Sequence, residues 1–260
     1  MKKIDSTTGR FYEIEQGIFY PSATTILSVR PLEAGLKLFF QTHTKEEADK
    51  LLKEAGMQGS KIHHTIELIM KKEIIMPSGF TPDQLDKTNL ISDEDFGDKE
   101  LLDYLKREFS EREDRMMKGF LNWWEVFKPE TIESEKIIFS KKYKYAGTLD
   151  WAGVIQVKGK PVICIIDWKT GKGLYKSYDL QVSAYLHAYN EMLKGKKKVK
   201  RPKKAYLLQL GINKCGYKFQ EAKDIKKDFK RFLHTLETFK DIYPDAKPGE
   251  DYKFLPEYKL

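Results

Sequence analysis

Apolar residues recur at helical spacing through much of the first half of this chain. They fall on one side of a helix across residues 44–72, where Gly56 and Gly59 predict a break into two helices. A second amphipathic stretch, residues 101–127, predicts one long helix that ends near Pro129. The pattern therefore indicates a first half that is mainly helical.

Shorter elements are expected around these helices. Residues 10–20 alternate apolar and polar positions and predict a hairpin that turns at a Gln-Gly pair. Ser22 is placed to cap a short helix that runs through Leu27, and Pro31 is placed to start another. A loop is expected at residues 77–98, which are rich in Pro, Gly, Asp and Ser.

The middle of the chain has the alternation and the residue types of β-strands. Three strands are expected, and the last two are joined by a turn at Lys158-Gly159-Lys160. A helix capped by Ser177 follows, and after it come another strand and a final amphipathic helix. The expected ranges are residues 131–139, 145–157 and 161–167 for the three strands, 205–210 for the next strand and 224–242 for the last helix.

This order of elements predicts an α/β fold with a central mixed sheet flanked by helices and a helical N-terminal part. Residues 1–260 contain neither an internal repeat nor a sharp change of composition, so a single domain is expected. Its parts are a mainly helical region over residues 1–130, a sheet core that carries the chemistry over 131–220, and a C-terminal helix and tail over 221–260.

Composition excludes several classes of protein. The hydrophobic share is 40%, and no apolar run approaches the roughly 20 residues that cross a bilayer. The start, Met-Lys-Lys-Ile-Asp, lacks an apolar segment behind its basic residues, so a cytoplasmic location is expected, or the host cytoplasm for a phage protein. Cys164 and Cys215 are the two cysteines, which excludes a four-cysteine zinc site or iron–sulfur cluster. A metal would therefore be bound by oxygen or histidine.

The net charge of +8 suits a polyanionic partner. Charge is densest in the basic run, residues 194–204, where eight of eleven residues are basic. A solvated loop kept open by self-repulsion and a patch that contacts phosphates are equally good interpretations of this run. The basic residues are Lys194, Lys196, Lys197, Lys198, Lys200, Arg201, Lys203 and Lys204.

The most informative segment is an apolar strand that ends in an acid and a base. Asp167 and Lys169 share one side of this strand because side chains alternate with a period of two. Asp150 lies in the preceding strand, and a hairpin would bring it beside Asp167. Two carboxylates at such a short distance repel each other unless a cation lies between them or one of them is protonated. Mg²⁺ or Mn²⁺ fits such oxygen ligands better than zinc does.

A divalent ion in this position would polarise a phosphate and lower the pKa of a bound water, and a nearby lysine would orient or deprotonate that water. The combination indicates hydrolysis of phosphodiester bonds. An isolated Asp-x-Lys is more often a surface ion pair, so the motif needs support from elsewhere in the chain.

That support comes from four motifs in a fixed order, through which the chain resembles the PD-(D/E)XK nuclease superfamily. The resemblance is to the branch that contains the RecB nuclease domain and the mitochondrial genome maintenance exonuclease, together with phage-type members. It implies the restriction-endonuclease-like core. The motifs are Gly59-Ser-Lys-Ile-His63, Gly147-Thr-Leu-Asp150, Asp167-Trp-Lys169 and Gln181-Val-Ser-Ala-Tyr185.

The resemblance carries roles onto the matching positions. It implies that Asp150 and Asp167 are metal ligands, that the backbone carbonyl of Trp168 is a further ligand, and that His63 reaches the same metal from a helix. Lys169 would be the base that activates water or a stabiliser of charge. These roles make Asp150, Asp167 and Lys169 the catalytic residues.

The resemblance also implies substrate contacts. Gln181 and Tyr185 lie four residues apart on one helix face, which the family places against the substrate strand. The basic run directly follows this helix and is expected to lie near one edge of the active cleft, so five of its residues are further candidates: Lys196, Lys197, Lys198, Lys200 and Arg201. Glu135 is a weaker candidate, because relatives often have a glutamate on the strand before the Gly-Thr-x-Asp motif. Structural roles are expected for the remaining histidines, His43, His64, His187 and His234.

These features predict a Mg²⁺- or Mn²⁺-dependent deoxyribonuclease, with an exonuclease on single-stranded or end-frayed DNA as the first interpretation. A structure-specific or nicking endonuclease would use the same chemistry. An inert nucleic-acid-binding protein is the alternative from another class. The chain lacks the Gly-x-x-x-x-Gly-Lys-Ser/Thr phosphate loop, so a helicase or another replication, repair or recombination protein would be a separate partner. Some relatives carry an iron–sulfur cluster, which two cysteines cannot form.

Overall fold

A computed structural model gives the fold of the chain and describes residues 1–6, 8–71, 99–196, 200–212 and 216–249. Some features expected from the sequence lie outside these ranges. They are the loop at residues 77–98, Lys197 and Lys198 of the basic run, and Cys215.

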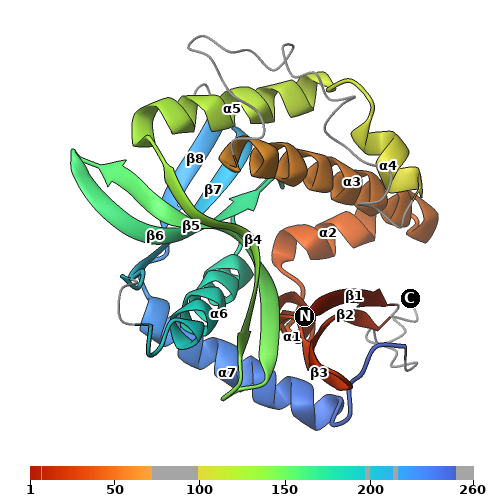
Figure 1. The fold of residues 1–260 in the computed structure, drawn as a ribbon. Coiled ribbons are helices and arrows are strands. Elements are labelled where there is room, and N and C mark those ends of the chain that lie inside the picture. Colours follow the sequence, from red (N-terminus) through yellow and green to blue (C-terminus); the bar gives the residue numbers. More distant parts are fainter. Residues whose placement is uncertain (7, 72–98, 197–199, 213–215, 250–260) are drawn as a thin grey trace.

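The centre of the molecule is a five-stranded mixed sheet, as the sequence predicts (Figure 1). Its strands follow the order β4-β5-β6-β7-β8, and only the β6–β7 pair among them is parallel. The last strand was not expected. The bounds are β4 (Glu130–Ser140), β5 (Tyr145–Val157), β6 (Lys160–Lys169), β7 (Lys204–Ile212) and β8 (Gly216–Glu221).

The turn between β5 and β6 fixes the register of the central hairpin. Lys158 and Gly159 both have positive φ, 51° and 71°. Two such residues in succession match the right-handed twist of the flanking strands, so the expected turn is confirmed. The register that follows pairs Trp151 with Ile166, and Asp150 and Asp167 are the next residues along the two strands.

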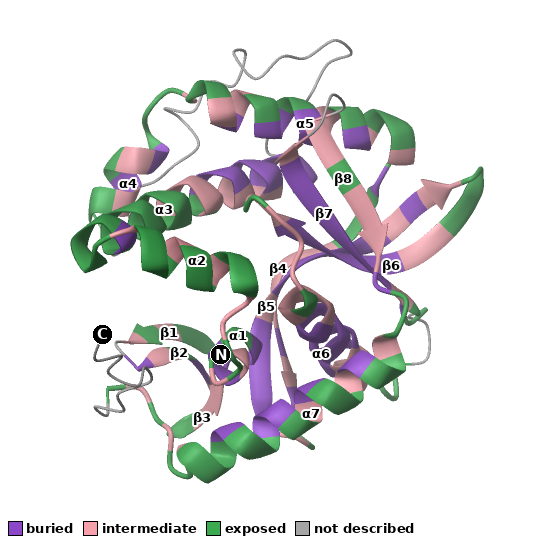
Figure 2. Ribbon diagram, turned by 180° about the vertical axis from the view of Figure 1, so that it is seen from behind, coloured by how far each residue is buried: buried purple, intermediate pink, exposed green. Residues whose placement is uncertain are grey.

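Helices cover both faces of the sheet. Figure 1 shows helices crossing one side of the sheet and others packed on the opposite side. Burial follows this arrangement, because the buried residues of the sheet are concentrated on its inner strands β5, β6 and β7, and the helices are buried on their inward faces and exposed on their outward faces (Figure 2). The first side carries α3 (Lys45–Met70) and α5 (Glu111–Phe127), and the opposite side carries α6 (Lys176–Met192) and α7 (Ile225–Ile242).

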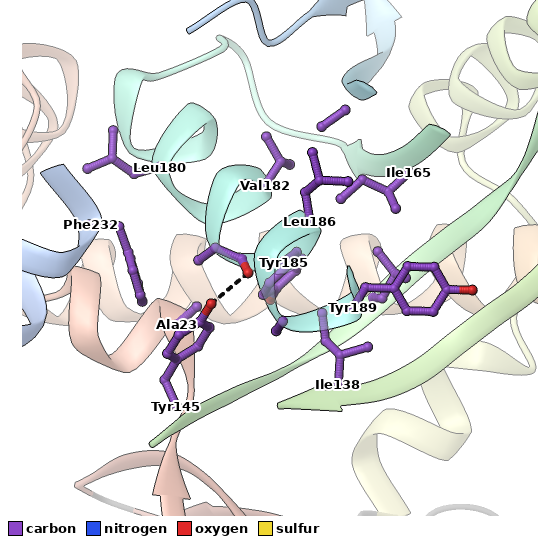
Figure 3. Packing of buried hydrophobic residues seen from close by; sticks show 14 of the residues in the cluster. Ala23, Ile138, Tyr145, Ile165, Leu180, Val182, Tyr185, Leu186, Tyr189 and Phe232 are labelled. Atoms are coloured by element: carbon purple, nitrogen blue, oxygen red, sulfur yellow. Dashed lines mark hydrogen bonds between the residues drawn. The ribbon is translucent and has the colours of Figure 1, made fainter. Parts of the chain in front are cut away.

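Each face has its own hydrophobic cluster. Beneath α6 and α7 the buried residues include Ile165 and Phe232, and the Tyr145 hydroxyl donates a 2.8 Å hydrogen bond to the carbonyl of Ala184 (Figure 3). Full burial of such side chains stabilises the fold by roughly 1.5–3 kcal/mol each. Helix α6 is therefore firmly attached to the sheet.

Under α3 and α5 the cluster is rich in tryptophan. The rings of Trp123 and Trp168 are 5.7 Å apart, and Trp151 is 6.4 Å from Trp168. Edge-to-face and tilted pairs at these separations are favourable arrangements for aromatic rings. The side chain of Trp168 is therefore part of the core, and its backbone is left to face the end of the sheet.

The N-terminal residues form a second, smaller sheet and a short helix. The hairpin expected at residues 10–20 is confirmed, and so is the cap of the helix, because the Ser22 hydroxyl accepts a hydrogen bond from Thr25 N at 2.9 Å. The first strand was not expected. The elements are β1 (Lys2–Ser6), β2 (Gly9–Glu15), β3 (Ile18–Pro21) and α1 (Ala23–Leu27).

Helix α3 runs unbroken through Gly56 and Gly59, so the predicted division into two helices is wrong. Each interior glycine weakens a helix by about 1 kcal/mol relative to alanine. A capping box formed by Thr44 and Glu47 secures the start of α3, and Ile62 and Ile66 bury the later turns. Tertiary packing therefore outweighs the local preference for a break.

The helix predicted over residues 101–127 is instead two helices, α4 (Lys99–Leu105) and α5. Helix α5 starts at a capping box between Ser110 and Glu113, which the continuous amphipathic pattern did not indicate. Lys61 stabilises the break, because its ammonium group donates to the carbonyls of Arg107 and Glu108 at 2.7 and 2.9 Å.

Two other helix starts differ from expectation. Helix α2 (Ala34–Thr42) begins after Glu33 rather than at Pro31, and α6 begins after Tyr175, so Ser177 lies in its first turn and is not its cap. The last helix begins after Asp224, as predicted. Among the helices of the described ranges, none is both long enough and apolar enough to cross a membrane.

Candidate active site

The hairpin of β5 and β6 brings the two predicted carboxylates together. The backbone N–H of Trp168, the residue after Asp167, donates a 2.8 Å hydrogen bond to Oδ2 of Asp150. Asp167 is 1% exposed and Asp150 is 8% exposed. Two buried acids on neighbouring strands are expensive unless protons or cations compensate them. The predicted pairing of acids is thus present.

A local irregularity turns a third carboxylate toward this pair. Leu149 packs under α6, but Trp151, two residues later, packs under α5, so the alternation of β5 changes at Asp150. On β4, Glu135 lies opposite Asp150 in the register and has a φ of 48°. A positive φ in a residue other than glycine costs of order 1–3 kcal/mol and is concentrated at functional sites.

These residues form a cluster that could hold a cation. One ligand atom from each of His63, Glu135 and Asp150 lies within 4.8 Å of the others. Nδ1 of His63 is 3.7 Å from Oδ2 of Asp150. Helix α3 therefore delivers a histidine to the place where β4, β5 and β6 present oxygen atoms.

A hydrogen-bonded network fixes the second half of the site. Nζ of Lys169 lies 2.6 Å from Oδ2 of Asp167 and donates to Oε1 of Gln181 at 3.1 Å. Nε2 of Gln181 lies 3.1 Å from both Oδ1 of Asp167 and the hydroxyl of Tyr185. Helix α6 thereby holds the acid and the lysine of β6 in a fixed relation.

Gly147 is required by this network. A Cβ at this position would lie 2.4 Å from the Tyr185 ring, which is too close for any side chain. The glycine of the Gly-Thr-x-Asp motif is therefore explained by the close approach of α6 to β5.

Electrostatics in the site follow from burial. Burial raises the pKa of Asp150 well above its usual range, and the charges of Asp167 and Glu135 add to the rise. Burial also raises the pKa of Glu135 to about 7 and lowers that of His63 to about 4. Asp150 and Glu135 therefore hold protons more readily than free carboxylic acids do, while the imidazole of His63 is neutral and available as a ligand.

Lys169 is held as a cation. Burial acts to lower its pKa, but the charges of Asp167 and Asp150 outweigh burial and raise it. Its Nζ lies 4.3 Å from the centre of the Tyr178 ring, a cation–π contact that also favours the charged form. Tyr178 was not predicted from the sequence.

The donor set matches a hard divalent cation. It consists of carboxylate oxygens and one imidazole, the ligands that suit Mg²⁺ and Mn²⁺. Oδ2 of Asp167 is buried and makes only its ion pair with Lys169, without a directed hydrogen bond to any described residue. Such an oxygen has lone pairs left for a ligand. The residues present therefore fit a Mg²⁺ or Mn²⁺ ion.

The site opens into a cleft of about 1160 Å³. Its walls come from α3, from the interior of β5 and the end of β6, from α6 and from the small N-terminal sheet. The predicted residues that line it are His63, Asp150, Asp167, Trp168, Lys169, Gln181 and Tyr185.

The basic run lies elsewhere. Its described members, residues 194–196 and 200–204, do not line the cleft, contrary to the expected position near its edge. Helix α6 starts near the site and leads away from it, and Lys204 pairs with Cys164, in the half of β6 away from Lys169. A contact between Lys196, Lys200 or Arg201 and nucleic acid remains a prediction, but at a place removed from the acids.

The other histidines have neighbours outside the network. His64 lines the cleft, with Nδ1 3.6 Å from Glu67. His187 stacks on Phe229 at 4.1 Å. The structural roles expected for both stay predictions, since His64 also borders the cleft.

The fold and this group of residues define a class, an α/β protein with a restriction-endonuclease-like core and a candidate divalent-metal site. Residues 32–257 match the sequence model of the PD-(D/E)XK nuclease superfamily, and the chain belongs to that superfamily. Its members are nucleases that use divalent metal ions, so the superfamily and fold predicted from the motifs are confirmed. A search of curated proteins gave no match.

Proposed function

We propose that this protein is a Mg²⁺- or Mn²⁺-dependent DNA nuclease of the RecB-like branch, acting as an exonuclease on single-stranded or end-frayed DNA. The observation that carries the proposal is the convergence of two groups in one cleft. One is the cluster of His63, Glu135 and Asp150, and the other is the ion pair of Asp167 and Lys169.

The acids and the histidine would hold the cation. Asp150, Asp167 and His63 would be its side-chain ligands, with the backbone carbonyl of Trp168, and the position of Glu135 adds it to this set. When bound, a divalent cation polarises the scissile phosphate and lowers the pKa of water. Burial, and after it the charges of Asp167 and Glu135, raise the pKa of Asp150, and a bound cation would relieve the repulsion among these acids.

Lys169 would stabilise the negative charge that develops on the phosphate. Its raised pKa supports this role over that of a base, because a protonated ammonium group cannot accept a proton. The ion pair with Asp167 and the hydrogen bond to Gln181 hold the ammonium group in place. A charge positioned in advance loses little free energy to reorganisation during the reaction.

Gln181 and Tyr185 would act at the boundary between site and substrate. Both line the cleft, yet they are only 7% and 4% exposed. Their hydrogen bonds to each other and to Asp167 support a role in orienting that acid. Contact with the substrate strand would be limited to the edge that faces the cleft.

Exonuclease action is inferred from the resemblance to RecB-like enzymes, and a structure-specific or nicking endonuclease is the competing proposal. The discriminating experiment incubates purified protein with end-labelled linear and covalently closed circular single-stranded DNA, in Mg²⁺, Mn²⁺ or EDTA. Loss of the linear DNA alone, only with a metal, is the expected result. Cleavage of the circle would favour the endonuclease, and binding without cleavage of any form would favour an inert nucleic-acid-binding protein.

A further inference from the structure

The small N-terminal sheet forms one wall of the cleft. Lys2, Lys3 and Arg10 line the cleft from this sheet, and Thr24 lines it from α1. All four precede residue 32, where the match to the superfamily begins. A part of the chain outside the matched range therefore borders the candidate metal site.

This wall is anchored close to the acids. The hydroxyl of Tyr12 and Oγ1 of Thr148 are hydrogen-bonded at 2.8 Å, and Thr148 precedes Asp150 by two residues. Ser22 forms a parallel bridge with Ala146 on the same strand. The small sheet is thus joined to β5 by both side-chain and backbone contacts.

The charges on the wall share a single acid. Strand register pairs Asp5 with Arg10, and alternation places Lys3 on the same face as Asp5. Asp5 Oδ1 lies 2.6 Å from Nε of Arg10, and Oδ2 lies 3.7 Å from Nζ of Lys3. Two cations with one carboxylate leave a net positive charge, and both side chains are more than two-fifths exposed, at 44% and 48%.

The wall and the acids line the same cleft. Lys3 and Arg10 line it together with Glu135, Asp150 and Asp167, so the exposed cations of the wall face the acids. Exposed cations that face a site for phosphodiester chemistry are placed to bind the neighbouring phosphates of a nucleic-acid strand.

We propose that Lys3 and Arg10 form a phosphate-binding wall that holds the nucleic-acid backbone next to the scissile bond, with Asp5 keeping the two cations in position. The inference rests on the proposed function for its substrate class. Because phosphate contacts carry no base information, this wall would bind strands of different sequence equally well.

The test measures binding without cleavage. All variants are made in an Asp167→Asn background, and anisotropy of a labelled single-stranded oligonucleotide is followed against salt concentration in Mg²⁺. The double variant Lys3→Ala/Arg10→Ala should bind more weakly, with a salt slope shallower by about 1.4, since each lost phosphate contact removes about 0.7. Asp5→Asn should bind more tightly than its parent, because it removes a negative charge while an amide oxygen can still accept the hydrogen bond that positions Arg10.

A matched control removes the same charge elsewhere. Lys226 and Lys230 are exposed on α7 and do not line the cleft, so Lys226→Ala/Lys230→Ala should retain the parent affinity and slope. The lost ion pairs are exposed ones and contribute only about 0–1 kcal/mol to folding, which circular dichroism and thermal unfolding would verify. Parent-like binding by the Lys3/Arg10 variant, or an equal loss in the control, would overturn the proposal.

The result also separates two kinds of failure. If the protein with Asp167 intact cleaves no nucleic acid, the proposed function fails, while the binding series still decides whether the wall contacts phosphates. If the enzyme cleaves DNA but the Lys3/Arg10 variant shows the parent slope, only the wall is wrong.

Discussion

Positive charge is arranged differently around the two ends of helix α6: it is dense at one end and sparse at the other. Beyond its C-terminal end lies the basic run, residues 194–204, the densest charge in the sequence. Near its N-terminal half lie only a few cations, among them Lys169, Lys3 and Arg10, but these line the cleft. About eleven residues of helix, or roughly 16 Å, separate Gln181 from the far end. Position relative to the strand ends, rather than charge density, therefore identifies the candidate site.

The largest effect on the cleavage rate is expected when one cation, Lys169, is removed at the end of α6 that lies near the site. Lys169→Ala should reduce single-turnover cleavage by about 10²–10⁴-fold, the range for loss of a positioned acid–base or charge-stabilising group. Metal binding measured by calorimetry should survive better than turnover, because a charge and not a ligand is lost.

Lys172→Ala is the matched control, since Lys172 is exposed three residues later and does not line the cleft. It should cleave at a rate close to that of the unmodified protein. Equal losses in the two variants would show that net charge, and not the placement of Lys169, controls the reaction.

A smaller effect, on metal affinity, is expected when one of two adjacent histidines is replaced. His63 lies 3.7 Å from Asp150, whereas His64 lies 3.6 Å from Glu67. His63→Ala should weaken Mn²⁺ binding by about 10–100-fold, in line with the losses seen when groups that support metal ligands are removed. His64→Ala should change it little. Similar titration curves for both variants would contradict the assignment of His63.

Metal should also stabilise the fold. A cation present at 100 times its dissociation constant should raise the free energy of unfolding by about 2.7 kcal/mol. Asp150→Asn should lose this response. In EDTA it should be at least as stable as the unmodified protein, because burial and the charges of Asp167 and Glu135 disfavour a charged group at position 150, and an amide carries no charge. Thermal unfolding with and without Mg²⁺ checks both statements, and a full metal response in the variant would count against Asp150 as a ligand.

The smallest effect is expected from the far end of α6. A variant with alanine at Lys194, Lys196, Lys200 and Arg201 should keep the salt slope for a short oligonucleotide that fills only the cleft. For a long strand the slope should become shallower by up to about 0.7 per lost contact. An unchanged slope for both would make the run a solvated loop, and a change for the short strand would place it nearer the cleft than the structure does.

The chemistry of the site was readable from the sequence because its residues lie on regular elements. Asp167 and Lys169 follow strand alternation, the β5–β6 hairpin brings Asp150 beside Asp167, and Gln181 and Tyr185 follow helical spacing. The family match confirms the fold, and the structure brings these five residues together.

Other parts of the site were not readable in this way. Glu135 was only a weak candidate, because its position depends on a local backbone irregularity with a positive φ that no spacing rule indicates. The continuity of α3 depended on packing that offsets two glycines. The wall that carries Lys3 depended on an unexpected first strand.

The most direct test of the central account is hydrolysis of end-labelled linear single-stranded DNA by the unmodified protein and by Asp167→Asn, each with Mn²⁺ and with excess EDTA. The account predicts cleavage only by the unmodified protein in Mn²⁺, with both proteins folded and binding DNA. Equal cleavage by Asp167→Asn, or full activity in EDTA, would contradict it.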